Sequence, residues 1–214
     1  MISRLEGSAI ALFSSHGFEG TSLRDIAAHA DVALSSIDRH FGSKLDIFNE
    51  VQRRIWKEIN AEREALMKKP LSLDDKGNPT LEALLHAFFY PIVIRVMEDS
   101  RGAPAVRLVR ETVAMRLHMG RTRSTRTEKE VADYWIRAIM QSCPRLPRSR
   151  AVWAYSFVVS SAYSWQLLDG WLEELLPPGS TRSAEDIVGM LCAFCSAGIR
   201  AVEAGRPTPT APDA

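Results

Sequence analysis

The chain has 214 residues, of which 46% are hydrophobic and 25% are charged, and its formal net charge is +1. This composition is typical of a globular protein that buries a substantial core without disulfides or metals, and no apolar run approaches the roughly 20 residues that a membrane span needs. The near-neutral balance excludes nucleic-acid binding through bulk basic charge alone.

The start of the chain predicts three short helices closed by tight turns. Apolar residues three or four positions apart predict a helix over residues 2–16, and Gly17 is positioned as a left-handed stop after it. Ser22 and Asp25 resemble a capping box, so a second helix is expected to begin there. A third, short helix is expected over about residues 34–40.

A long fourth helix is expected to follow. Ser43 and Asp46 are spaced to cap its start, and an inward apolar stripe continues to about Lys68. At about 24 residues with a rise of 1.5 Å each, this helix would span about 36 Å, which suits a connector between two parts of the protein. A loop rich in turn-forming residues comes next, over residues 70–79.

The remaining sequence predicts five further helices and no strand pattern, so we expect an all-α fold of about nine helices. Their expected ranges are about 80–98, 103–118, 127–142, 149–174 and 184–204. Thr80, Ser149 and Ser183 are natural N-cap residues for three of them. The proline-rich tail, residues 206–214, is expected to be disordered.

The third helix is expected to present one side to solvent, because Ile37 and Phe41 are spaced to point inward. Small hydroxyl residues at a helix start allow a close approach to a DNA groove, and a helix N-terminus suits a phosphate. The alternative is an ordinary solvated surface. The predicted DNA-binding residues are Thr21, Ser22, Arg24, Ala33, Leu34, Ser35, Ser36, Arg39, His40 and Lys44.

Two runs in this region, HGFEGTSLRDIA and HFGSK, resemble in content and separation the DNA-binding head of the TetR family of transcriptional regulators. The resemblance covers the chain to about residue 50, and beyond that point it rests on helix number and length. The matching residues are Phe13, Gly17, Phe18, Thr21, Ser22, Leu23, Ile26, Ala27, Ala30, Val32, Ile37, His40, Phe41, Ser43 and Lys44.

Two positions depart from the family pattern. Asp31 stands in the turn where the family usually has glycine, and aspartate tolerates the left-handed conformation better than most residues. Asp38 stands where many members carry a tyrosine that contacts a phosphate. A carboxylate there would repel DNA unless it accepts from a cytosine amino group or pairs with Arg24 or Arg39.

The resemblance implies a division of the chain and a set of partners. Residues 1–48 would form a helix-turn-helix DNA-binding head and residues 49–205 a helical ligand-binding and dimerisation body, with 206–214 as the disordered tail. It further implies a homodimer, a palindromic operator on double-stranded DNA, and a small-molecule effector that releases a repressor.

A ligand pocket is expected in the body. The run LLHAFFYPIVIRVM, residues 84–97, is unusually apolar, and Pro91 has no N–H for the carbonyl of Ala87, so this helix should kink or begin anew and open space. We expect a largely apolar, acyl-chain-like effector. The predicted ligand-binding residues, for each of which plain core is the alternative, are Phe88, Phe89, Met97, Met115, Met119, Trp135 and Tyr155.

A dimer interface is expected on the last two helices, which are apolar over broad faces. Pairing with their copies in a second subunit would give a four-helix interface, and the alternative is that both helices only fill the core of one subunit. The predicted interface residues are Trp153, Phe157, Ser161, Trp165, Leu168, Leu191, Phe194, Gly198 and Val202.

No motif typical of an enzyme is present, so we expect no catalysis, no cofactor and no metal site. Cys143, Cys192 and Cys195 lack metal-ligand spacing and predict free thiols in a cytoplasmic protein without a membrane partner. The predicted function is therefore sequence-specific transcriptional regulation. The alternative is a ligand-binding or protein-interaction module of the same fold with weakened DNA binding.

Overall fold

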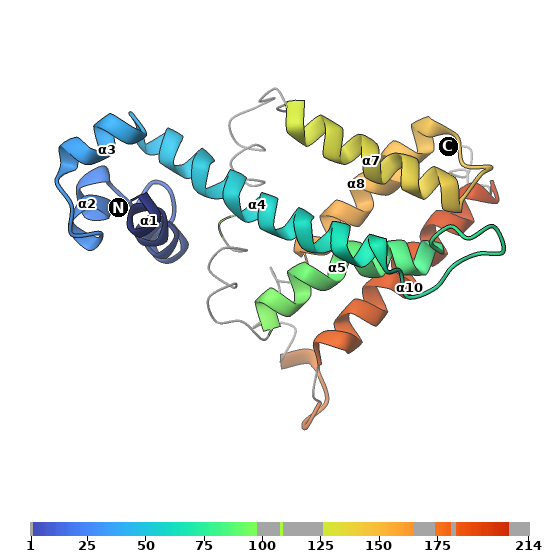
Figure 1. Cartoon of the computed structure of the whole chain (residues 1–214). Helices are drawn as coiled ribbons and strands as arrows, with labels where there is room; N and C mark the ends of the chain where they lie inside the picture. Colours follow the sequence, from blue (N-terminus) through green and yellow to red (C-terminus); the bar gives the residue numbers. More distant parts are fainter. Residues whose placement is uncertain (1, 98–107, 109–125, 165–173, 181–182, 206–214) are drawn as a thin grey trace, which may run out of the picture. The chain divides into compact units, whose positions relative to one another are not determined.

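The computed structural model describes residues 2–97, 108, 126–164, 174–180 and 183–205, except for the side chain of Asp38. Within these ranges the structure is α-helical and contains no sheet, which confirms the all-α prediction. The helices are α1 (Ile2–His16), α2 (Leu23–His29), α3 (Leu34–His40), α4 (Lys44–Lys68), α5 (Leu81–Met97), α7 (Arg126–Ser142), α8 (Arg148–Ser164) and α10 (Ala184–Glu203) (Figure 1).

Two predicted helical segments lie outside the described residues. These are the helix expected over 103–118 and the stretch 165–173 of the helix expected over 149–174. The expected tail, 206–214, also lies outside them. None of the described helices is long and apolar enough to cross a membrane.

The chain divides into two compact units. One unit comprises Met1–Glu62 with Ile94–Thr122, and the other comprises Arg63–Val93 with Arg123–Ala214. Two helices, α4 and α5, therefore contribute residues to both units.

In the first unit, α1, α2 and α3 gather around the N-terminal end of α4 (Figure 1). Three aromatic rings form its centre: Phe13, which is 0% exposed, lies 5.8 Å from Phe18 and 5.2 Å from Phe48 between ring centroids. Edge-on and offset ring pairs of this kind add to the free energy of apolar burial. We use the word head for α1, α2, α3 and this end of α4.

Local signals in the sequence set the turns of the head. Gly17 ends α1 with a φ of 72°, and its N–H donates to the carbonyl of Phe13 at 2.9 Å. Ser22 and Asp25 form the predicted capping box at the start of α2. Asp31, with a φ of 52°, is the one non-glycine residue of the described chain in the left-handed region, as expected for the turn before α3.

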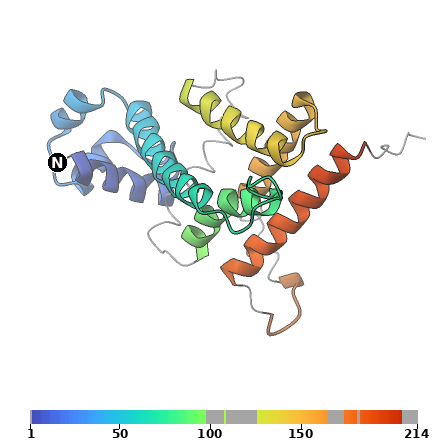
Figure 2. The same cartoon turned by 45° about the vertical axis from the view of Figure 1, so that its right-hand side comes forward.

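In the second unit, α7 packs against α8, and α8 packs against α10 (Figure 2). Ser183 caps α10 through a second capping box, and the Thr80 hydroxyl accepts from the N–H of Ala83 at the start of α5. The prediction for Ser149 was wrong, because α8 begins one residue earlier and Ser149 lies inside its first turn. α5 continues as one helix through Pro91 and does not begin anew.

The capping box at Ser22 generates a stability prediction. Replacing Ser22 by alanine removes the acceptor for the N–H of Asp25, so the free energy of unfolding should fall by about 1 kcal/mol. The same change at Ser15, an exposed serine inside α1, should be neutral or slightly stabilising, because alanine is the better helix former. Chemical denaturation followed by circular dichroism measures both, and equal effects of the two changes would contradict the capping role.

Candidate nucleic-acid interface and ligand pocket

The predicted outward face of α3 is exposed. Ile37, which is 0% exposed, anchors the helix in the head, while Leu34 is 38% exposed at the start of α3 and Ser36 is half-buried. The predicted DNA-binding residues that lie exposed are Ser22, Arg24, Ala33, Leu34, Ser35, Arg39 and His40. They come from the start of α2 and from α3, the two helices of a helix-turn-helix.

Thr21 is placed differently from what we expected. Its side chain is buried, and its hydroxyl donates to the carbonyls of Leu12, at 3.2 Å, and Gly17, at 2.9 Å. These two bonds tie the turn before α2 to the end of α1. Thr21 therefore shapes the turn and offers no free hydroxyl to a phosphate.

Lys44 also has an internal role that the sequence did not reveal. Its Nζ donates to the carbonyl of Phe18 at 2.9 Å and lies 4.3 Å from the centroid of the Phe18 ring. An ammonium group has three N–H donors, so two remain for other partners. Lys44 thus fastens the start of α4 to the turn after α1.

Several acidic residues of the head serve its own structure. Asp25 accepts from Ser22 through both side chain and backbone, and these hydrogen bonds hold the pKa of Asp25 below its ordinary value. Asp46 accepts from Ser43 at the start of α4, and Glu6 pairs with Arg54. These carboxylates compensate helix N-termini or a cation, so they add less negative charge to the exposed surface than the sequence count implies.

In the second unit, four of the predicted ligand-binding residues meet, with Phe88 in contact with the other three. The ring of Phe88 lies 5.0 Å from Trp135 and 6.2 Å from Tyr155, between centroids, and 5.6 Å from Phe89. We call Phe88, Trp135 and Tyr155 the aromatic cluster. It borders a cavity of about 10 Å³ lined by Leu84, Leu85, Phe88, Trp135, Ile139, Tyr155 and Val158. A cavity this small holds no more than about one water molecule, so the cluster is closed.

The predicted methionines do not join the aromatic cluster within the described residues. Met97 is 40% exposed and belongs to the other compact unit, beyond the last buried turn of α5. Met115 and Met119 lie outside the described residues.

Arg63 is the residue of this region that our sequence reasoning missed. It is 2% exposed, its Nε donates to the carbonyl of Phe88 at 3.0 Å, and its guanidinium carbon lies 3.8 Å from the Phe88 ring centroid. Burial lowers the pKa of Arg63. A signal was present, because Arg63 follows Ile59 by four positions and so continues the inward stripe of α4.

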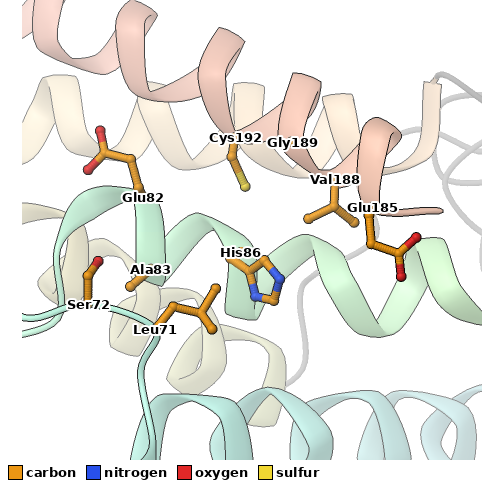
Figure 3. Close-up of a pocket in the computed structure, with 9 residues that line it drawn as sticks. All are labelled: Leu71, Ser72, Glu82, Ala83, His86, Glu185, Val188, Gly189 and Cys192. Carbon is orange, nitrogen blue, oxygen red and sulfur yellow. The ribbon is translucent and has the colours of Figure 1, made fainter. Parts of the chain in front are cut away.

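A larger hollow, also missed from the sequence, lies between α5, α10 and the loop before α5 (Figure 3). This groove has a volume of about 370 Å³ and is lined by Leu71, Ser72, Glu82, Ala83, His86, Glu185, Val188, Gly189 and Cys192. Burial raises the pKa of the Cys192 thiol to about 12, which keeps it protonated and unreactive. Within the described part of the chain, no three His, Cys, Asp or Glu side chains are grouped to hold a metal ion.

Large apolar side chains of α8 and α10 are exposed on the single chain. Trp153 is 65% exposed, Phe157 61% and Phe194 79%, and the rings of Trp153 and Phe157 lie 6.2 Å apart. Val202 and Gly198 are also exposed, while Ser161 and Leu191 are half-buried. Trp165 and Leu168 lie outside the described residues. Exposed aromatic residues on adjoining helices are typical of a surface that another molecule covers.

Comparison with known families agrees with this geometry. The family model described as bacterial regulatory proteins, tetR family, matches residues 7–51, and the tetracyclin repressor-like C-terminal domain matches residues 86–198. The first match coincides with the head and defines a helix-turn-helix DNA-binding regulator, a class without enzymatic activity. The chain belongs to the TetR family of transcriptional regulators.

Solved structures share the fold at low sequence identity. The ketosteroid transcriptional regulator KstR2 of Mycobacterium tuberculosis is 17% identical with a TM-score of 0.60, and the alignment covers 92% of this chain and 93% of that one. The fatty acid degradation regulator FadR of Bacillus halodurans is 13% identical with a TM-score of 0.62, over 91% and 93%. AibR, in complex with isovaleryl coenzyme A and operator DNA, is 15% identical with a TM-score of 0.59, over 90% and 96%. A comparison with curated protein sequences found no significant match.

His86, in the groove, generates a prediction of pH dependence. Burial lowers the pKa of His86 below its ordinary value, so the unfolded chain binds this proton more readily than the folded one. The stability linked to His86 is therefore fully present above about pH 6.5 and is lost as the pH falls through the lowered pKa. The substitution His86→Gln should make the free energy of unfolding fall less between about pH 7 and pH 5 than in the wild type. Denaturant titration at each pH measures the free energy of unfolding of both proteins. If the wild type and His86→Gln show the same dependence on pH, His86 does not contribute to it.

Proposed function

We propose that the protein is a sequence-specific transcriptional repressor that binds a palindromic operator as a homodimer and is released by a small apolar effector. The observation that carries this proposal is the outer face of α3, which stays exposed while Ile37 fixes the helix from inside. A helix held in this way can enter the major groove of DNA.

In this proposal residues 1–48 act as the DNA-binding domain. Arg39 is the best placed to read a base, because an exposed guanidinium can donate two hydrogen bonds to guanine. Ser35 would contact base edges or phosphates nearby, and Arg24 and His40 would contact phosphates. A regulator of this kind acts in the cytoplasm, on the bacterial chromosome.

Residues 49–205 act as the dimerisation and effector domain. The exposed rings of Trp153, Phe157 and Phe194 would be covered by the same surface of a second copy, since a two-fold axis pairs identical patches. Four helices, α8 and α10 from each subunit, would then form the interface.

The effector would bind where Phe88, Trp135 and Tyr155 meet, after these side chains move apart. The lining of this closed cavity is apolar, which favours an apolar molecule such as an acyl chain. Two structurally similar regulators support this class, one named for fatty acid degradation and one determined with isovaleryl coenzyme A.

Release of the operator would follow from differential binding. Two heads must sit about 34 Å apart to enter successive major grooves on one face of DNA. An effector that binds more tightly to a conformation with a different spacing shifts the population toward that conformation and lowers operator affinity. The helix that carries this change is α4, because it continues without a break from the head into the second unit.

The DNA-binding proposal is tested with a duplex that the protein itself selects from random sequences. The substitution Arg39→Ala should weaken binding to this duplex by about 1–3 kcal/mol, which is roughly 5- to 150-fold. Arg53→Ala is the matched control, because Arg53 is an exposed arginine of the same unit that is paired with Glu50, and it should change affinity little. Fluorescence anisotropy measures both. If the wild-type protein selects no duplex at about 50 mM salt, the result would favour a ligand-binding or protein-interaction module with weakened DNA binding.

The dimer proposal makes a separate prediction. Replacing Phe194, which is 79% exposed, by arginine places a charge at the centre of the proposed interface and should convert dimers to monomers at micromolar concentration. Leu73, an exposed leucine of the loop before α5, serves as the control, and Leu73→Arg should leave the mass unchanged. Sedimentation velocity distinguishes the two states, and a monomeric wild-type protein would contradict the proposal.

A further inference from the structure

Arg63 connects α4 to the aromatic cluster through two contacts with one residue. Its Nε donates to the backbone carbonyl of Phe88 at 3.0 Å, and its guanidinium stacks on the Phe88 ring, 3.8 Å from the centroid. The same guanidinium lies 5.7 Å from the Trp135 ring centroid. Since Arg63 is 2% exposed, these contacts lie in a desolvated core, where cation–π attraction is strongest.

The cavity beside the cluster cannot accept an effector unless its walls move. Its volume is about 10 Å³, whereas even a small ligand pocket measures about 300 Å³. Phe88 is one of the residues that line this cavity, and its ring also contacts the guanidinium of Arg63. Displacement of the Phe88 ring by an occupant therefore changes the packing of Arg63 at once, because interiors are close-packed.

The backbone next to Phe88 is also weaker than a regular helix. Pro91 has no N–H, so the carbonyl of Ala87 lacks its usual intrahelical donor. Arg63 bonds the neighbouring carbonyl, that of Phe88, and thereby supports α5 at this point. A shift of α5 here would act on Arg63 through the carbonyl as well as through the ring.

We propose that Arg63 is the positioning residue through which occupancy of the aromatic cluster acts on α4, and so on the head at the other end of that helix. The inference rests on the proposed function, because it takes the cluster as the effector site and DNA release as the output. In this scheme Arg63 holds α4 in the DNA-binding conformation for as long as Phe88 keeps its place. When Phe88 is displaced, Arg63 either loses its contacts with Phe88 or moves together with it. In both cases the position of α4 changes.

A second contact between α4 and α5 provides a matched control. Arg95 of α5 pairs with Glu58 and Glu62 of α4, and the exposed fraction of these two carboxylate side chains is about half. The Arg95 side chain itself is 17% exposed, but water reaches both carboxylates and screens the ion pairs, so they contribute little. Arg95 is not among the residues that line the cavity. Its loss should therefore leave the coupling between cavity and DNA intact.

The test replaces the unidentified effector by a larger side chain in the cavity wall. Val158 and Ile139, which are both 2% exposed and lie on different helices, are changed separately to phenylalanine. Each change is made in the wild type, in Arg63→Met and in Arg95→Met. Circular dichroism and thermal melting verify folding, and two independent cavity variants guard against one that fails to fold. The readout is the ratio of operator dissociation constants with and without the cavity change.

The expected ratio is about 10 in the wild type and in Arg95→Met, and about 1 in Arg63→Met. A merely structural Arg63 would lower the melting temperature and leave the ratio near 10, which would overturn the inference. A wild-type ratio of 1 would overturn it too, because the cavity would then have no effect on DNA binding. Absence of wild-type binding to any duplex would instead refute the proposed function, and the inference would fall with it.

Discussion

The proposed DNA-binding function depends on one feature of the structure, the burial of Ile37 in the head. A helix of seven residues such as α3 is too short to be stable by itself, so tertiary packing must hold it. Ile37 supplies that packing with 0% exposure, and the left-handed turn at Asp31 sets the direction in which α3 leaves α2. With the inner side fixed, Ser35 and Arg39 face solvent, and the head becomes a surface that can be presented to DNA.

Helix boundaries could be predicted from the sequence because their signals are local. The two capping boxes need only residues three apart, and both Ser22 and Ser183 occupy the expected positions. Among these local signals only the cap predicted at Ser149 was wrong, by one residue. The other predictions that differed depended on partners distant in the sequence. The side chain of Thr21 turns inward and donates to the carbonyl of Leu12. This carbonyl comes within reach only after folding, so the sequence did not reveal the contact. Arg63 could be assigned to the inward stripe of α4, but its carbonyl and ring partners on α5 could not be predicted from periodicity.

The hydrophobic pattern alone could not show which apolar residues of α8 are buried and which are exposed. Val158 and Tyr163 of this helix are buried in the second unit, whereas Trp153 and Phe157 are exposed. Because α8 is apolar around most of its circumference, sequence periodicity does not distinguish a core face from an interface face. The helix α8 both lines the cavity and carries part of the proposed dimer surface. Opening of the cavity would therefore act on the relation between subunits as well as on α4.

The central claim is that the outer face of α3, presented twice by a symmetric pair, recognises a specific duplex. Selection from random DNA followed by hydroxyl-radical footprinting measures this most directly. The account predicts one enriched sequence with two-fold symmetry, protected in two patches whose centres lie about 34 Å apart on one face of the helix. Enrichment of no sequence, or protection without symmetry, would contradict it.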